Sequence, residues 1–452
     1  MKRLDIEPTE DALLESIRSN CTDRNDDIID FIKLLSETKG PYSFMIDASW
    51  GDGKTFFVKS IELVLRALNP HIASASCSSS DLAYIIDNLN DTDASILPFY
   101  FNAWDNDFAD DPITALFACM AAEFDRNDLL DAPKVRDAIA SVLDAGLAAL
   151  QIQIHVSEIV SALTSESLIS AFKSKDEVRK RITELADTSI CEVANTLVIF
   201  IDELDRCRPD FAVRLLEQTK NLFSSENTIL VFSADSSQLA KAVGGIYGPG
   251  FDTARFLERF FDERITMTPV DAHSFANDGK KRGGTSRFDK LVNEVLDGMT
   301  FTIRDAYRLK HKLNAARSYY LEGNHQELPQ MVACCTVLPL LVFIERDDID
   351  LFRTITSGAD FDALYEYGKR YEAFKENVKG TIARPCSNIH ADNQQEFTDA
   401  GCKAYMHDLC MAIYGTPEGH PEYYEAMSHL GGSYSPSFDG RVYKQLAFND
   451  QA

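Results

Sequence analysis

Residues 42–57 read YSFMIDASWGDGKTFF, and this stretch decides the fold. An apolar run comes first, glycines follow at Gly51 and Gly53, and Lys54 and Thr55 open a segment with helical spacing of apolar residues. Glycines here let backbone N–H groups turn inward around phosphate oxygens, and the positive N-terminal end of a helix favours the same charge. In such a loop the lysine reaches the terminal phosphates and the threonine hydroxyl binds Mg²⁺. The stretch predicts a phosphate-binding loop between a strand and a helix.

The loop departs at one position from the usual pattern G-x-x-x-x-G-K-[ST], because the first glycine falls at Ala48. Alanine gives up some backbone freedom but leaves the residues that would cradle a phosphate in place. A chance occurrence of Gly-x-Gly-Lys-Thr is the alternative interpretation, since short motifs also occur without function. The residues expected to bind the nucleotide are Trp50, Gly51, Asp52, Gly53, Lys54, Thr55 and Phe56.

A second stretch, residues 196–206, is an apolar strand that ends in charged residues, TLVIFIDELDR. At the carboxyl end of a parallel strand, Asp202 can hold Mg²⁺ through its carboxylate. The next side chain, Glu203, points elsewhere and can polarise an attacking water. A strand end that is merely solvated is the alternative. Taken with the loop, the pair Asp202 and Glu203 predicts nucleoside triphosphate hydrolysis. Lys54 and Glu203 are the expected catalytic residues, and Thr55 and Asp202 are the expected magnesium ligands.

Five apolar runs rich in β-forming residues alternate with helical patterns, which is typical of a parallel sheet covered by helices on both faces. We predict strands at Tyr42–Ile46, Ile96–Phe101, Thr196–Ile201, Thr228–Phe232 and Arg264–Met267. Pro98 cannot donate to a strand ladder, so the second strand should begin late or lie near an edge. We expect an α/β P-loop NTPase in which the fourth strand lies between the loop strand and the acidic strand. If the chain is of the additional-strand class, its sheet has the order 5-1-4-3-2.

The pattern along the chain predicts four regions. They are an N-terminal helical segment at 1–40, the NTPase core at 41–275 with a helical insert at about 106–190, a helical lid at 276–325, and a mostly helical C-terminal domain at 326–452. The glycine-rich stretch Gly244–Gly250 is expected to form a loop or turn.

Four segments give the chain its resemblance to the KAP family of P-loop NTPases. They are Ala48–Thr55, Phe101–Trp104, Phe200–Arg206 and Phe232–Asp235, with a weaker similarity at Phe256–Phe261. The resemblance spans about residues 40 to 320, and it does not extend to the last 130 or so residues.

The resemblance implies ATP binding and hydrolysis, and a helical insert that in many members carries membrane-spanning helices. It assigns Lys54 and Thr55 to phosphate and magnesium, Asp202 to magnesium and Glu203 to the water. Bacterial members are associated with mobile-element functions and phage exclusion, often alongside neighbouring proteins. The departure at Ala48 bears on nucleotide affinity rather than on the fold.

Several arginines are candidates to stabilise the negative charge of the transition state. The arginines that follow elements of the expected site are Arg206, Arg208, Arg255 and Arg259. Arg259 is the best candidate for an arginine finger, because it follows the helix after the fourth strand, where related ATPases present one. Ion pairing with Glu203, Glu258 or Asp262 is the alternative for each arginine.

Two further pairs of residues near the expected site each have alternative roles. Ser233 or Asp235, at the end of the fourth strand, can sense the γ-phosphate, and a plain turn residue is the alternative. Trp104 and Trp50 can line the nucleotide pocket, although core packing is the safer expectation for Trp104.

Two features of the C-terminal half also have alternatives. Thr302 is expected to cap a helix whose basic run is Arg304, Arg308, Lys310, His311, Lys312 and Arg317. In a lid Arg304 can contact the γ-phosphate; nucleic acid binding and a solvated helix face are the alternatives. Zinc ligands are conceivable among Cys386, His390, Cys402, His407 and Cys410, but they lack a C-x₂-C knuckle. The vicinal pair Cys334-Cys335 is expected to be buried as small hydrophobes.

Composition excludes some classes of protein. The chain has 452 residues and a formal net charge of −26, so it repels nucleic acid and anionic membranes except at a local basic patch. The 10 cysteines are scattered, no apolar segment precedes residue 20, and the candidate span 139–163 is broken by polar residues. We therefore expect a cytoplasmic protein without a membrane anchor.

Two functional hypotheses follow. In the first, the chain is a Mg²⁺-dependent ATPase whose hydrolysis resets a conformational switch in a bacterial defence or mobile-element system. In the second, ATP holds a scaffold in one state with negligible turnover. We expect self-association or a partner effector protein, and a DNA motor is disfavoured by the charge.

Overall fold

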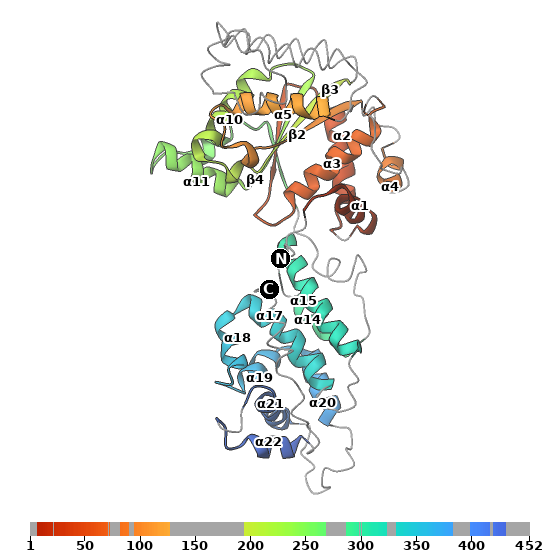
Figure 1. The fold of residues 1–452 in the computed structure, drawn as a ribbon, viewed down its shortest axis with the longest axis vertical. Coiled ribbons are helices and arrows are strands. Elements are labelled where there is room, and N and C mark those ends of the chain that lie inside the picture. The colour runs from red at the N-terminus through yellow and green to blue at the C-terminus, as the bar shows by residue number, and fades with distance from the viewer. Residues whose placement is uncertain are drawn as a thin grey trace. The chain divides into compact units, whose positions relative to one another are not determined.

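We describe a computed structural model that covers residues 7–20, 22–70, 72, 82–89, 95–126, 194–267, 286–297, 299, 301–322, 331–382, 398–415 and 419–430. These residues divide into two compact units, residues 6–269 and residues 270–452 (Figure 1).

The first unit is built on a five-stranded sheet in which every strand pair is parallel. Its strands are β1 (Tyr42–Asp47), β2 (Ile96–Asn102), β3 (Thr196–Asp202), β4 (Thr228–Ala234) and β5 (Glu263–Thr266). The order β2-β3-β4-β1-β5 is the expected order 5-1-4-3-2 counted from the other edge. The additional-strand arrangement is therefore confirmed.

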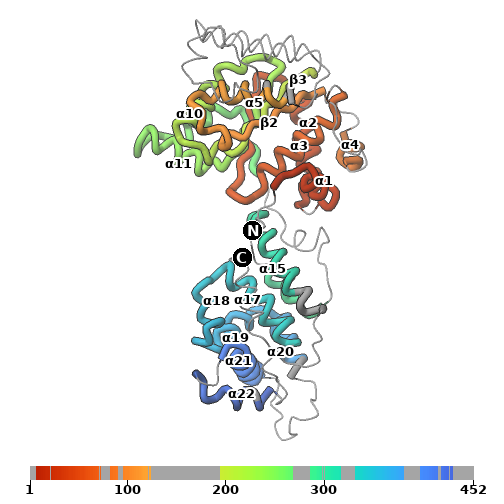
Figure 2. The backbone as a smooth tube through the Cα atoms, viewed as in Figure 1, coloured from red at the N-terminus to blue at the C-terminus, as the bar shows by residue number. Residues whose placement is uncertain are grey.

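Helices cover both faces of this sheet (Figure 1, Figure 2). One face carries α1 (Glu10–Ser19), α2 (Asn25–Glu37), α3 (Lys54–Leu68) and α4 (Ala83–Asp87), and the other carries α5 (Pro112–Arg126), α10 (Pro209–Leu222), α11 (Ser236–Tyr247) and α12 (Thr253–Leu257). Alternate residues of each strand point to opposite faces, so Phe44 packs on the first layer and Met45 on the second. The continuous apolar runs of the sequence exist because both faces are buried.

The register aligns the carboxyl ends of the central strands. Asp202 of β3 is level with Ser233 of β4, and Ser233 is level with Ile46 of β1. This edge of the sheet is where ligands bind in open α/β folds.

Pro98 lies on an edge strand, as its missing N–H requires. Strand β2 pairs with β3, where Pro98 is opposite Val198, and β2 ends the sheet order. The proline therefore costs no ladder bond inside the sheet.

The prediction of a loop at Gly244–Gly250 is wrong for the first half of that stretch. Helix α11 continues through Gly244 and Gly245 to Tyr247 and closes where Gly248 N–H donates to the Gly244 carbonyl. Val243 is buried on this helix, and tertiary packing of that kind outweighs the poor helix propensity of glycine. Only the turn at 248–250 remains, where Gly248 and Gly250 have positive φ.

The helical insert is described only at its start, where α5 continues the chain from 112 to 126. The remainder, including the segment 139–163, lies outside the described residues. Within the described ranges, no helix combines the length and the apolar run that a membrane crossing needs.

In its described part, the second unit is helical. Its helices are α14 (Arg287–Leu296), α15 (Ile303–Glu322), η5 (Ala333–Val337), α17 (Leu338–Asp347), α18 (Ile349–Thr356), α19 (Ala363–Gly368), α20 (Glu372–Ile382), α21 (Asp399–Tyr414) and α22 (Tyr423–His429). Cys334 and Cys335 are fully buried in the π-turn η5, as expected of small hydrophobes. Thr302 accepts from the N–H of Asp305, which confirms it as a helix cap.

Candidate functional site

The loop between β1 and α3 has the backbone of a phosphate cradle. Gly51 and Gly53 have φ of 94° and 81°, in the region that glycine enters without strain, and Gly53 is the N-cap of α3. Ser49 and Asp52 close the loop reciprocally: Ser49 N–H donates to the Asp52 carboxylate at 3.0 Å, and Asp52 N–H donates to the Ser49 carbonyl at 3.2 Å. Glycine therefore occupies the two loop positions at which the turn requires a positive φ.

Ala48 does not need the freedom of a glycine. Among the described residues, the non-glycine positions with positive φ are Asn20, Asp23 and Glu203, so Ala48 has a backbone that any residue adopts. The departure from the usual motif therefore carries no backbone strain.

Lys54 lies folded across its own loop. Its side chain is buried, and Nζ donates to the carbonyls of Ala48 at 2.7 Å and Ser49 at 3.2 Å. These neutral acceptors leave the positive charge available to a phosphate. Thr55 and Phe56 follow in the first turn of α3, both half-buried.

Asp202 is a carboxylate that fits a bound cation. It is fully buried, Oδ1 accepts from Glu203 N–H at 2.9 Å, and Oδ2 accepts from the Tyr100 hydroxyl at 2.9 Å. No ion pair of the described residues includes it, and a buried charge normally requires a partner. Beside it on β4, the Ser233 hydroxyl is buried without a hydrogen-bond partner in the described part of the chain. Asp202 with Thr55 suits Mg²⁺, which would neutralise phosphate charge and orient the phosphates when bound.

Glu203 has an unusual backbone. Its φ is 60° in the left-handed region, which costs a residue with a side chain about 1–3 kcal/mol and persists where surrounding structure enforces it. The carboxylate pairs with Arg206, 2.7 Å from Oε1 to Nη1. Burial raises the pKa of Glu203, while Arg206 opposes that rise. Such strain beside Asp202, the predicted magnesium ligand, favours a functional role for Glu203.

Both tryptophans of the chain lie at this site. The indole N–H of Trp50 donates to the carboxylate of Asp205 in η4 (Leu204–Arg206), and the guanidinium of Arg206 lies 5.4 Å from the ring centre of Trp104. The expectation of core packing for Trp104 is wrong, since the side chain is 48% exposed in η1 (Trp104–Asn106). The short turn after β2 ends the strand and carries the ring to the surface.

Asp235 has a structural use at the end of β4. Its carboxylate caps α11, accepting from the N–H groups of Ser237 at 3.0 Å and Gln238 at 3.2 Å. Of the two candidates for a γ-phosphate sensor, Ser233 has a buried hydroxyl without a partner among the described residues, whereas Asp235 already uses Oδ1 to cap α11.

Sequence reasoning missed Asp47, Arg264 and Tyr100. The carboxylate of Asp47 accepts from Ser236 N–H at 2.8 Å and from Arg264 Nε at 3.0 Å. These contacts tie the loop strand β1 to β5 and to the start of α11. The available signal was the position of Asp47 at the end of the first strand, but its partners are remote in the chain.

The predicted arginines take different positions. Arg206 forms the local ion pair with Glu203, and Arg208 donates to the carbonyl of Asp107 at 2.9 Å. Arg255 and Arg259 are exposed around α12, and no described ion pair includes either side chain. The finger role of Arg259 stays a prediction.

The remaining candidates belong to the second unit. In the basic helix α15, Lys312 pairs with Glu345 at 2.9 Å, and the roles predicted for Arg304 and its neighbours stay predictions. Of the conceivable zinc ligands, Cys402 and Cys410 are buried, His407 contacts the carboxylate of Asp362 at 2.8 Å, and 386 and 390 lie outside the described residues. No group of three metal-ligating side chains occurs in the described part of the chain.

Comparison with known proteins agrees with this geometry. Residues 25–278 match the family model described as the KAP family P-loop domain. No curated protein matches the chain. The match covers more than half of the sequence and includes both the loop and the acidic strand, so this chain belongs to the KAP family of P-loop NTPases.

Proposed function

We propose that this protein binds ATP with Mg²⁺ and hydrolyses it. The observation that carries the proposal is the buried carboxylate of Asp202, which lies without a cationic partner among the described residues at the edge of the sheet that holds the phosphate loop. Lys54 and the loop N–H groups would hold the phosphates, Thr55 and Asp202 the magnesium ion, and Glu203 would orient the water.

The test is equilibrium binding and turnover of ATP, with Mg²⁺ and with EDTA. Lys54→Ala should abolish binding, because no other side chain of the loop carries a positive charge. Lys33→Ala, an exposed lysine of α2, is the matched control. Binding of ATP by the Lys54→Ala protein as tight as that of the native chain would refute the phosphate loop.

A scaffold with negligible turnover is the second candidate, and the ion pair between Glu203 and Arg206 favours it. Arg206 holds Oε1 of this glutamate and so competes with a water for the carboxylate while the pair is closed. Arg206→Ala separates the two functions. In an ATPase whose glutamate is held by Arg206, the variant should turn over ATP faster, whereas in a scaffold the rate of turnover should stay low.

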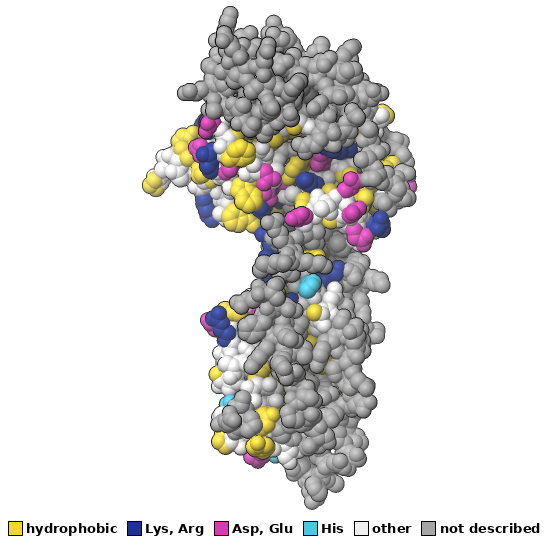
Figure 3. All heavy atoms as spheres, in the orientation of Figure 1, with side chains coloured by type: hydrophobic (Ala, Val, Ile, Leu, Met, Phe, Trp, Pro, Cys, Tyr) yellow, Lys and Arg dark blue, Asp and Glu magenta, His cyan; other side chains and the backbone are white. Residues whose placement is uncertain are grey.

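The cation for the transition state is proposed to come from a neighbouring subunit, with Arg259 as its source. A group of exposed hydrophobic residues lies close to it in sequence, at the end of α11 and in the following turn: Ile246, Tyr247 and Phe251. The rings of Tyr247 and Phe251 stack with centroids 4.4 Å apart, and Figure 3 shows hydrophobic side chains gathered over this part of the first unit. Exposed apolar groups of this kind mark protein contacts.

The biological setting is proposed to be a bacterial antiviral or mobile-element system in the cytoplasm, with a partner effector. This part of the proposal rests on the family resemblance and on the scattered cysteines. It is tested by counting phage plaques on bacteria that express the native chain, with its genomic neighbours, or the Lys54→Ala variant. Equal plaque counts for the two would reject a nucleotide-dependent role in defence.

A further inference from the structure

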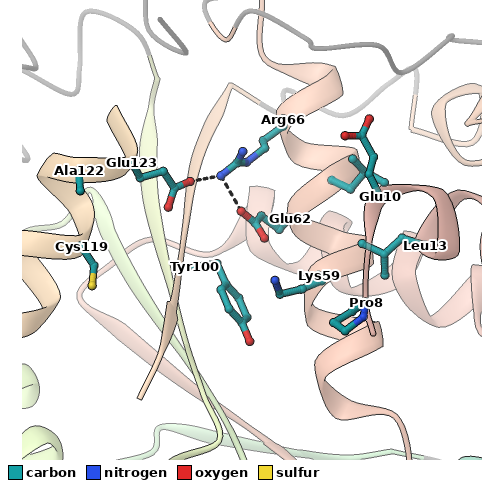
Figure 4. A pocket seen from close by; sticks show the side chains of 11 residues that line it. Pro8, Glu10, Leu13, Lys59, Glu62, Arg66, Tyr100, Cys119, Ala122 and Glu123 are labelled. Atoms are coloured by element: carbon teal, nitrogen blue, oxygen red, sulfur yellow. Dashed lines mark hydrogen bonds and ion pairs between the residues drawn. The ribbon is translucent and has the colours of Figure 1, made fainter. Parts of the chain in front are cut away.

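Tyr100 of strand β2 borders a cavity and also contacts the predicted magnesium ligand Asp202. The cavity has a volume of about 540 Å³ and is bounded by residues of α1, α3, β2 and α5 (Figure 4). Its charged lining includes Arg66 of α3, which pairs with Glu62 and Glu123, and Lys59. Tyr100 stands among these residues, and its hydroxyl is the group that reaches Asp202.

The hydroxyl of Tyr100 can act only as a donor towards Asp202. The hydroxyl lies 2.9 Å from Asp202 Oδ2, and since a carboxylate oxygen accepts, the phenol O–H is the donor of this bond. The ammonium group of Lys59 lies 4.3 Å from the centre of the ring. A cation on the ring face withdraws electron density and makes the phenol a stronger donor.

This bond completes the orientation of the Asp202 carboxylate. One oxygen is held by the backbone N–H of Glu203, which belongs to the same chain segment, and the other is held by Tyr100 from a different strand. With both oxygens held, the carboxylate cannot rotate about its last torsion without losing a hydrogen bond in a buried site. Partners of this kind orient metal ligands and contribute to metal affinity.

We propose that Tyr100 is a positioning residue that sets the Asp202 carboxylate for magnesium, with Lys59 strengthening its hydrogen bond. The proposal rests on the proposed function, since it assumes that Asp202 holds Mg²⁺ beside a nucleotide. A purely structural role for Tyr100 would affect folding but not the concentration of magnesium that the folded protein requires.

The experiment uses the full chain with a non-hydrolysable ATP analogue and follows the thermal unfolding midpoint as MgCl₂ is added. Tyr100→Phe removes the hydroxyl and keeps the ring. Because the ring borders a cavity, the variant should fold. We expect the Mg²⁺ concentration for half-maximal stabilisation to rise about 10-fold or more, the usual effect of losing such a partner. Binding of the analogue in EDTA should not change, because Lys54 and the loop are intact.

A matched control is present in the same unit. Tyr84 donates its hydroxyl to Asp26 at 2.9 Å on an exposed surface, so Tyr84→Phe removes the same kind of bond without touching the site. It should leave the magnesium requirement unchanged. Lys59→Met, which keeps the packing of the stem, should shift the requirement in the direction of Tyr100→Phe by a smaller factor. If Tyr100→Phe does not fold, the magnesium requirement of Lys59→Met tests the proposal in its place.

The outcomes separate this inference from the proposed function. A native protein that binds the analogue and responds to Mg²⁺, together with unchanged requirements in Tyr100→Phe and Lys59→Met, overturns the role of Tyr100 and leaves the nucleotide site standing. A native protein that shows no response to the analogue or to Mg²⁺ refutes the nucleotide site itself.

Discussion

The indole N–H of Trp50 in the phosphate loop donates a hydrogen bond to the carboxylate of Asp205, which follows strand β3. Asp205 is buried, whereas the Trp50 side chain is about half exposed. The bond joins the two segments that would act on the nucleotide. The loop is therefore tied directly to the turn that carries Glu203 and Arg206.

A double-mutant cycle measures this bond. Trp50→Phe leaves a buried carboxylate without its donor, and Asp205→Ala removes the acceptor, so the two changes should not be additive. We expect a coupling of about 1 kcal/mol in the free energy of unfolding, within the range found for residues in contact. Chemical denaturation followed by circular dichroism provides the four values, and Asp205→Asn, which keeps an acceptor oxygen, is the control. Additivity of the two changes would show that the bond does not form in solution.

Glu203→Gln tests the water-orienting group. Glutamine keeps the size of the side chain but cannot take a proton, so turnover should fall by about 10²-fold or more. ATP with Mg²⁺ should stay bound, because the loop and Asp202 are unchanged. Tryptophan emission reports binding directly, since the chain has 2 tryptophans and both lie at the site. Undiminished turnover would move the catalytic role to another carboxylate.

Asp235→Ala should affect stability rather than catalysis. The carboxylate caps α11 through two backbone N–H groups and the hydroxyl of Ser237 at 2.6 Å. Loss of an N-cap costs about 1 kcal/mol, so the free energy of unfolding should fall by that amount, and Asp235→Ser should recover most of it. Urea unfolding measures the change. A large loss of turnover at full stability would instead make Asp235 a sensor.

Ser233→Ala should have the opposite profile. The buried hydroxyl has no hydrogen-bond partner in the described part of the chain, so its removal takes away a desolvated polar group and should not lower the free energy of unfolding. If the hydroxyl contacts the γ-phosphate, turnover falls while ADP still binds normally. ATP turnover and ADP affinity, measured on the same preparation, check the expectation; unchanged turnover would leave Ser233 with no part in the reaction.

Arg259→Ala tests the supply of a cation from a second subunit. An arginine provided in this way raises the rate by about 10³–10⁵-fold in related phosphoryl-transfer enzymes. The turnover per subunit of the native chain should rise with protein concentration, and the variant should lose the rise but keep its ATP affinity. Arg255→Ala is the matched control, because that side chain is exposed on α12, the short helix that precedes the turn with Arg259. Flat specific activity from a strict monomer would assign the missing cation to another protein.

The sequence by itself determined the elements that are local in the chain. The loop with Gly51, Gly53 and Lys54, the strand ending in Asp202, and the edge position of the strand with Pro98 follow from backbone preferences and apolar periodicity within a few residues. Each was predicted correctly because a strand buried on both faces and a glycine turn leave a local pattern. Prediction from local composition failed at the glycines of α11, where composition indicated a loop but the packing of Val243 extends the helix.

Only the tertiary structure decided how the site is held together. Tyr100 and Asp202 are 102 positions apart, Trp50 and Asp205 are 155 apart, and Asp47 and Arg264 are 217 apart. Periodicity carries no information on such pairs, because each depends on which strands are neighbours and on their register. The parallel order of β1 to β5 brings these segments together, and the burial of Asp202 makes its bond to Tyr100 strong and costly to lose.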